Sequence, residues 1–157
     1  MSRYTLVYAY VLPDSILTLE RIGCSLVFMQ TVFLLALAGA CGALARHGLS
    51  LGVNATLGLL WPHTDFPWGI FVVNVLGCFL FGLIWELAAM RHLLSDASRT
   101  VLLVGFVGSF TTFSTLIFDS NRLLQASQEV LLVLNLGGQV VLGIAALRLG
   151  FWCVRTV

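Results

Sequence analysis

Charged residues are scarce in this sequence. Only 10% of the 157 residues are charged, whereas 59% are hydrophobic, and mean hydropathy is +1.01. An average soluble domain has about 25% charged residues. Lysine is absent, because all eight basic residues are arginine, and the net charge is only +1. This balance excludes a basic surface of the kind that binds nucleic acid, and it predicts an integral protein of the lipid bilayer.

Residues for metal, redox or acid–base chemistry are also missing. The four cysteines form no CxxC pair and no metal-ligand spacing, so we interpret them as small packing residues. No carboxylate or lysine lies in the middle of a predicted span, where a proton-coupled pump normally needs a titratable group. No sequence pattern joins the histidines to a nucleophile or a metal site. These are His47, His63 and His92, near span ends or in loops. The sequence therefore argues against a proton pump and against an enzyme.

Uncharged segments long enough to cross a bilayer as helices occur four times. They predict an all-α membrane protein whose four transmembrane helices cover about 30–47, 67–88, 100–118 and 129–150. Residues 48–67, rich in Gly and Asn, are predicted to connect the first two spans.

The first 28 residues differ from the rest. Their apolar run Tyr4–Pro13 has about half the length that a bilayer span needs. We expect residues 29–157 to form the four-helix domain, and we hypothesise that residues 1–28 are upstream translation, with Met29 as the working start. Peptides from residues 1–28 in protein from its native source would contradict this. The alternative is an amphipathic surface segment.

The first span ends in closely spaced small residues. Ala38/Gly42 and Gly39/Ala43 are small-xxx-small pairs, which let helix backbones approach closely, so this face is predicted to pack against protein. Arg46 follows. It either reaches to the membrane interface or supplies a cation to an anion vestibule.

The third span has an unusual number of hydroxyl groups. The stretch Gly105–Thr115 holds five of them together with two glycines. On a continuous helix these hydroxyls would point to most sides of the axis. The segment is therefore either surrounded by protein or broken near Gly108–Thr112. Broken helices place free backbone groups where channels and transporters bind ions.

The other spans carry neutral amides. Asn74 lies near the middle of the second span, and Asn135 and Gln139, four residues apart, form one stripe of the fourth. These amides either hydrogen-bond between helices or donate to an ion that must lose its water. The pattern indicates an ion pathway, with an anion slightly favoured.

Orientation in the membrane is weakly specified. One predicted side carries Arg91, Arg99, Arg148 and Arg155, and the other carries Arg46 and Arg122. Four arginines on one side and two on the other are a small positive-inside bias. We hypothesise that the chain inserts both ways and pairs with an inverted copy of itself.

Three motifs occur in an order that resembles one known family. Gly39–His47 resembles GGxxGAxxR[YF], Pro67–Gly82 resembles PxGTxxVNxxGxFxxG, and Gly105–Thr115 resembles GFxGxxTTFST. The sequence is similar to the small fluoride channels called Fluc or CrcB, from about Met29 to Phe151.

The resemblance implies a channel that passively exports fluoride across the plasma (inner) membrane and relieves its toxicity. It implies an antiparallel, dual-topology homodimer with two fluoride pathways. It also implies a structural sodium ion at the break of the third helix, held by the backbone carbonyls of Gly108 and Thr111 from both subunits.

The same resemblance assigns residues to the pathway. Asn74 and Phe113 would line the fluoride route, and Ser114 and Thr115 would add a hydroxyl track. The vestibule and its surroundings would comprise Arg46, Thr112, Asp119, Asn135 and Gln139.

The chain departs from the family pattern at several positions. Leu116 replaces a second phenyl ring, which puts the usual coordination of fluoride in question. The other departures are Ala38 for Gly, His47 for an aromatic residue, Ile70 for Thr, Asp119 for Glu, Asn135 for Tyr and Gln139 for Ser.

Two other classes of function compete with the channel. An accessory membrane subunit without conduction would have polar groups scattered for packing rather than clustered at one break. A small dual-topology drug exporter would need a carboxylate in its first helix, and residues 22–45 contain none.

Overall fold

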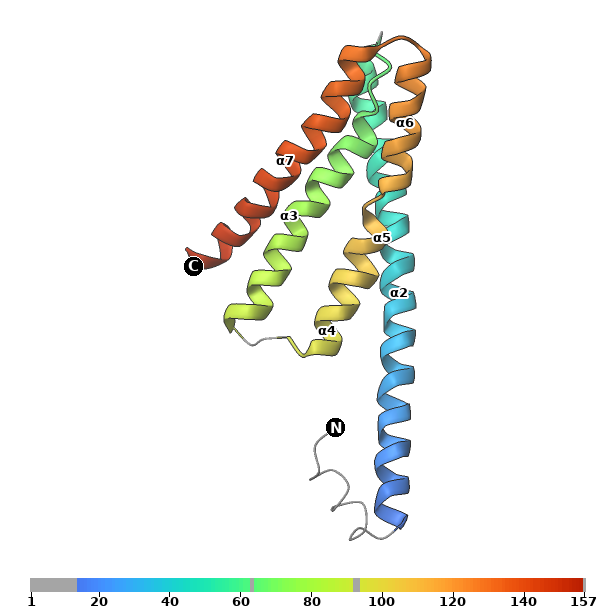
Figure 1. Ribbon diagram of the computed structural model, residues 1–157, viewed down its shortest axis with the longest axis vertical. Coiled ribbons are helices and arrows are strands. Elements are labelled where there is room, and N and C mark those ends of the chain that lie inside the picture. Colours follow the sequence, from blue (N-terminus) through green and yellow to red (C-terminus); the bar gives the residue numbers. More distant parts are fainter. Residues whose placement is uncertain (1–13, 63, 92–93, 157) are drawn as a thin grey trace, which may run out of the picture. The chain divides into compact units, whose positions relative to one another are not determined.

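The computed structural model describes residues 14–62, 64–91 and 94–156, and all regular structure in these ranges is helical (Figure 1). The elements are α2 (Asp14–Leu60), α3 (Trp68–Arg91), α4 (Asp96–Thr100), the π-helix η1 (Val101–Val107), α5 (Gly108–Phe110), α6 (Phe113–Gln125) and α7 (Glu129–Arg155). Four described segments are long and apolar enough to cross a membrane: Ser25–Leu60, Trp68–Met90, Asp96–Gln125 and Glu129–Arg155. The predicted all-α, multi-pass membrane protein is confirmed.

The chain divides into two compact units, Met1–Phe33 and Leu34–Val157. Helix α2 begins in the first and continues through Met29 into the second without interruption. Residues 1–13, which are nearly half of the predicted extension, lie outside the described residues, as do His63 and His92. Everything below concerns the second unit.

The predicted connector over 48–67 is wrong for residues 48–60, which continue α2 as helix. Each glycine in this stretch costs helix stability, but residues 48–60 carry no charge. Away from water the backbone needs internal hydrogen bonds, and a helix supplies them. The Oδ1 atom of Asn54 also accepts a hydrogen bond of 2.8 Å from the Gly69 N–H, which ties this end of α2 to the first turn of α3.

The small residues of α2 pack against protein, as predicted, and their partner is the third span. A Cβ atom at Gly105 would lie 2.9 Å from the Cβ of Ala38, and one at Gly39 would lie 3.3 Å from the Oγ of Ser109. A Cβ atom at Gly42 would collide with the carbonyl oxygen of Phe106. The two backbones therefore approach closely just before the hydroxyl-rich stretch.

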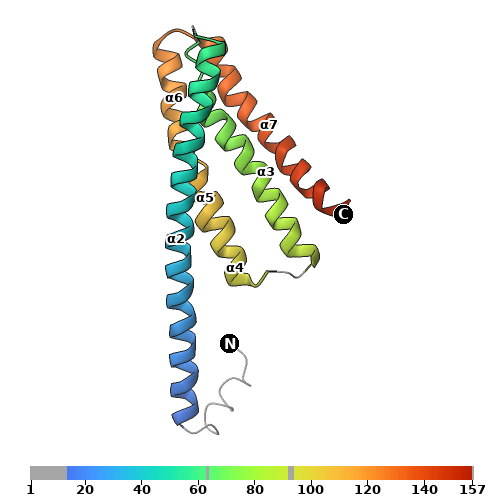
Figure 2. The ribbon, with the colours of Figure 1, turned by 180° about the vertical axis from the view of Figure 1, so that it is seen from behind.

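Helices α3 and α7 lie side by side, with α3 between α7 and the α4–α5 half of the third span (Figures 1 and 2), whereas α6 packs directly against α7. Gly82 and Gly150 permit the approach, because a Cβ atom at Gly82 would collide with the Leu147 backbone and one at Gly150 with the Phe79 backbone. At the same end of the pair, about one turn further along each helix, Arg155 Nε donates to the buried Glu86 carboxylate at 2.7 Å. The packed helices α3 and α7 hold the side chains of the site in place.

The third span is interrupted where the break was predicted. Helix α5 ends at Phe110, and Thr111 and Thr112 are extended, with φ/ψ of −84°/160° and −150°/119°. Helix α6 then begins at Phe113, and the interruption is visible between α5 and α6 in Figure 1. Of the two readings of the hydroxyl-rich stretch, the broken helix is correct.

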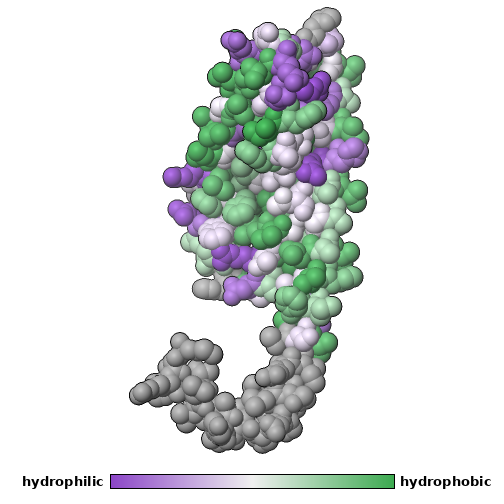
Figure 3. All heavy atoms as spheres, turned by 45° about the vertical axis from the view of Figure 1, so that its right-hand side comes forward, coloured by the Kyte–Doolittle hydropathy of each residue, from purple (hydrophilic) through white to green (hydrophobic). Residues whose placement is uncertain are grey.

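Hydrophobic side chains cover much of the face drawn in Figure 3. Large apolar residues are widely exposed on every long helix, including Leu44 on α2 and Val141 on α7. Such a surface is stable in lipid, whereas a soluble monomer rarely exposes apolar patches of this size.

Candidate functional site

The side chain of Asn74 on α3 closes the break of the third span. Its Oδ1 accepts a hydrogen bond of 2.9 Å from the Thr112 N–H, and its Nδ2 donates to the Thr112 carbonyl at 3.1 Å. In an unbroken helix that N–H would donate to the carbonyl of Gly108, four residues earlier. A side-chain amide thus replaces the missing backbone partner, as buried backbone groups require.

Asn74, which is half-buried, is also the first member of a hydrogen-bonded series of side chains, here called the amide relay: Asn74, Gln139, Asn135 and Ser120. Asn74 Nδ2 donates to Gln139 Oε1 at 2.6 Å, Gln139 Nε2 donates to Asn135 Oδ1 at 2.8 Å, and Asn135 Nδ2 donates to Ser120 Oγ at 3.0 Å. Asn135 is fully buried, and Gln139 is 7% exposed. The predicted polar stripe of the fourth span therefore faces inward and joins α3 to α6.

Hydroxyl groups cluster at the start of α6. The Oγ1 of Thr112 accepts from the Thr115 N–H at 3.3 Å, which caps the helix. The same oxygen lies 3.2 Å from Ser114 Oγ and 3.0 Å from Thr115 Oγ1. Thr112 is buried and Ser114 is exposed, so the cluster leads from the break to the surface of the chain.

The break also changes the surroundings of two backbone carbonyls. The Gly108 carbonyl loses its usual helical donor, because the Thr112 N–H donates to Asn74 Oδ1 instead. The Thr111 carbonyl accepts no backbone hydrogen bond from the residues that the structure describes. The N–H and the hydroxyl of Thr111 both donate to the Val107 carbonyl, at 3.1 and 3.2 Å. Gly77 on α3 leaves room for Thr111, because a Cβ atom there would collide with the Thr111 methyl group. Backbone oxygens of this kind are suitable ligands for a hard cation.

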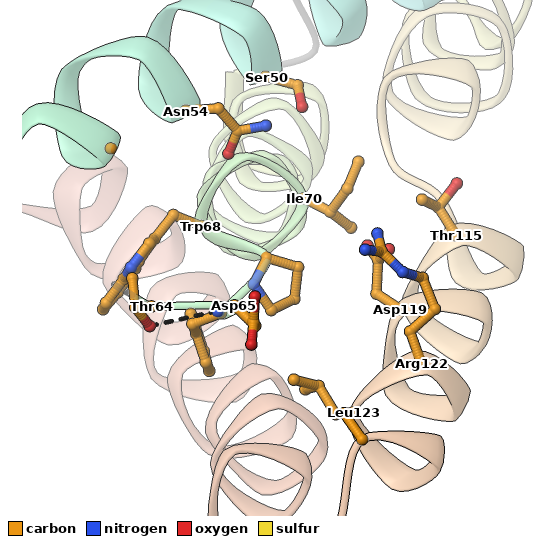
Figure 4. A pocket seen from close by; sticks show the side chains of 14 residues that line it. Ser50, Asn54, Thr64, Asp65, Trp68, Ile70, Thr115, Asp119, Arg122 and Leu123 are labelled. Atoms are coloured by element: carbon orange, nitrogen blue, oxygen red, sulfur yellow. Dashed lines mark hydrogen bonds between the residues drawn. The ribbon is translucent and has the colours of Figure 1, made fainter. Parts of the chain in front are cut away.

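A cavity of about 590 Å³ lies between α2, α3 and α6, close to the hydroxyl cluster. Thr115, Asp119 and Arg122 of α6 line one side of it, and Ser50 and Asn54 of α2 line another (Figure 4). The cavity therefore contains both signs of charge and several neutral polar groups.

The structure separates the predicted site residues into two groups. Asn74, Thr112, Asn135 and Gln139 meet in the amide relay and at the break. Phe113 does not join them, because its ring is 75% exposed on the outer face of α6.

Arg46 was expected to end its span and lies instead within α2, half-buried, one turn before the cavity residue Ser50. Asp119 lines the cavity. Sequence reasoning missed Ser120, which completes the relay, and it used Arg122 only to judge orientation in the membrane. The spacing of Asp119 and Arg122, three residues apart on one helix face, was the available signal for Arg122.

Comparison with known proteins covers most of the chain. The sequence pattern of the family described as "CrcB-like protein, Camphor Resistance (CrcB)" matches residues 33–151. A protein of Solidesulfovibrio magneticus named "Fluoride-specific ion channel FluC" is 53% identical over 129 residues, which are 82% of this chain and 99% of that protein.

Proteins of the same name from Nitratidesulfovibrio vulgaris and Nitrosococcus oceani are 47% and 46% identical. Their alignments cover 82% and 78% of this chain and 100% and 94% of those proteins. The matched segment contains the broken third span, its Asn74 partner and the amide relay, and the chain belongs to the CrcB-like protein family.

Proposed function

We propose that this protein is a fluoride-selective ion channel that lets fluoride leave the cell passively across the plasma membrane and so relieves fluoride toxicity. The observation that carries the proposal is identity of 53% and 47% over 99% and 100% of two proteins named as fluoride channels. The accessory-subunit and drug-exporter alternatives are not favoured, because no such protein is among these relatives and the first span has no carboxylate between residues 22 and 45.

The chemistry of the break suits such an ion. Asn74 offers amide hydrogens, and Ser114 and Thr115 offer hydroxyls next to the cavity. The exposed Phe113 offers the positive edge of its ring, which can face an anion. All four groups are neutral, so they can replace part of the water around a small anion without exchanging a proton. We assign these four residues to the fluoride route.

The direct test is ion efflux from liposomes that contain the purified full chain, with fluoride and chloride measured in parallel. We expect fast fluoride efflux and no chloride efflux. Fluoride selectivity would also show that Leu116 is compatible with the pathway. If folded protein gives no fluoride efflux, the channel is refuted and the accessory subunit becomes the better assignment.

We further propose that two copies assemble antiparallel and that a sodium ion is held by the carbonyls of Gly108 and Thr111 from each copy. The Gly108 carbonyl has lost the Thr112 N–H as a donor, the Thr111 carbonyl accepts no backbone hydrogen bond from the described residues, and a resident cation would satisfy both. Next to the break, α6 exposes Phe113, Ile117 and Phe118, an apolar face that a second copy would cover.

This assembly makes a separate prediction. The purified protein should have the mass of a dimer by light scattering, and sodium should raise its unfolding temperature more than potassium at equal ionic strength. Tags on the two ends of each copy should be accessible from both sides of the membrane. A monomer, or equal unfolding temperatures in the two salts, would contradict the proposal.

A further inference from the structure

The amide of Asn74 has no N–H to spare. A side-chain amide carries two N–H groups, and those of Asn74 donate to the Thr112 carbonyl and to Gln139 Oε1. An anion that binds to Asn74 must therefore displace one of these two acceptors.

The two acceptors differ in how easily they can move. The Thr112 carbonyl is part of the backbone at the start of α6, and the N–H of the same residue is also bound by Asn74. Gln139 Oε1 is at the end of a side chain with three rotatable bonds on α7. Within the described residues, its Nε2 donates to Asn135 alone, at 2.8 Å. Gln139 is therefore the acceptor that can withdraw without opening the break.

We propose that Gln139 is a positioning residue that orients the Asn74 amide toward the break and competes with the permeating anion for one of its N–H groups. This inference rests on the proposed fluoride channel. Competition of this kind keeps the anion weakly bound at Asn74, and conduction requires an ion site that releases its ion quickly. Asn135 supports the arrangement by holding the other end of the Gln139 amide.

The test compares two substitutions that move the acceptor strength in opposite directions. Gln139→Met keeps the shape and removes the acceptor, so one Asn74 N–H becomes available. We expect the half-saturating fluoride concentration of efflux to fall about tenfold, the value of one hydrogen bond to a charged group, with a lower maximal rate. Gln139→Glu keeps an acceptor and adds negative charge, so this concentration should rise. Gln125→Met, the same change at an exposed residue of α6, should behave like the wild type.

A structural role for Gln139 would give a different result. Both substitutions would then lower the maximal rate and leave the half-saturating concentration unchanged, and this outcome would overturn the proposal. A second readout does not depend on transport. In protein labelled with ¹⁵N at asparagine, the side-chain signals of Asn74 should shift in Gln139→Met and stay in place in Gln125→Met.

The two readouts separate this inference from the proposed function. If the wild type carries no fluoride, the channel is refuted, and competition with fluoride is refuted with it. The NMR signals of Asn74 then decide whether Gln139 orients the amide. Unchanged Asn74 signals in Gln139→Met would refute the positioning role even in a protein that conducts fluoride.

Discussion

Fluoride efflux should fall at least about a hundredfold when Asn74 is replaced by aspartate. The carboxylate can still accept from the Thr112 N–H, but it cannot donate to the Thr112 carbonyl or to Gln139 Oε1. It also places a negative charge beside the proposed route. Two like charges 4 Å apart repel by about 4 kcal/mol at an effective dielectric constant of about 20, which is nearly a thousandfold in occupancy.

The matched control for this substitution is Asn121→Asp. It makes the same chemical change at an exposed residue of α6, and its efflux should stay within about twofold of the wild type, because an exposed charge is screened by water. Liposome efflux with equal amounts of folded protein measures both variants. If Asn74→Asp kept more than half of the wild-type efflux rate, the assignment of Asn74 to the fluoride pathway would be wrong.

The second large effect is expected on stability. Gly42→Ala should lower the free energy of unfolding by about 3 kcal/mol, the upper end of the usual range for overpacking. The added methyl group would collide with the Phe106 carbonyl, and it would also lie 3.1 Å from the Phe110 N atom. Backbone atoms cannot rotate aside as a flexible side chain can. Helix α2 and the third span would therefore have to separate.

Gly48→Ala is the control on the same helix, because a Cβ atom there would have no neighbour within 4 Å. Alanine is the better helix former, so Gly48→Ala should leave stability unchanged or raise it by about 0.5–1 kcal/mol. Unfolding of the purified protein in a denaturing detergent measures both. Equal stabilities for the two variants would show that the close approach at Gly42 does not exist in the membrane.

Local composition showed that the third span is not an ordinary lipid-facing helix, and the family resemblance favoured a break over a helix surrounded by protein. Five hydroxyl groups within Gly105–Thr115 leave no apolar face for lipid, and that inference needs no tertiary information. The partner of the break was not predictable in this way. Asn74 and Thr112 are 38 positions apart, and only the packing of α3 against the third span shows that this amide pairs with Thr112.

The errors have physical reasons as well. The stretch 48–60 reads as a loop if glycine and asparagine are weighed as in water, but its lack of charge favours a helix in a membrane. Arg46 was expected to end its span because a loop was predicted to follow it. The relay residues Asn135 and Gln139 were expected to share a stripe, because helical spacing is local. Their link to Ser120 on another helix required the fold.

The amide relay has one consequence for the electric field at the break. Every hydrogen bond in it is donated in the same sense, from Thr112 to Asn74, then Gln139, Asn135 and Ser120. The peptide group that begins this series carries the Thr111 carbonyl at its other end. Aligned dipoles polarise one another by roughly 10–30% per bond. We therefore expect the amides on α3 and α7 to raise the negative partial charge on the Thr111 oxygen, and removal of the last acceptor by Ser120→Ala to lower it.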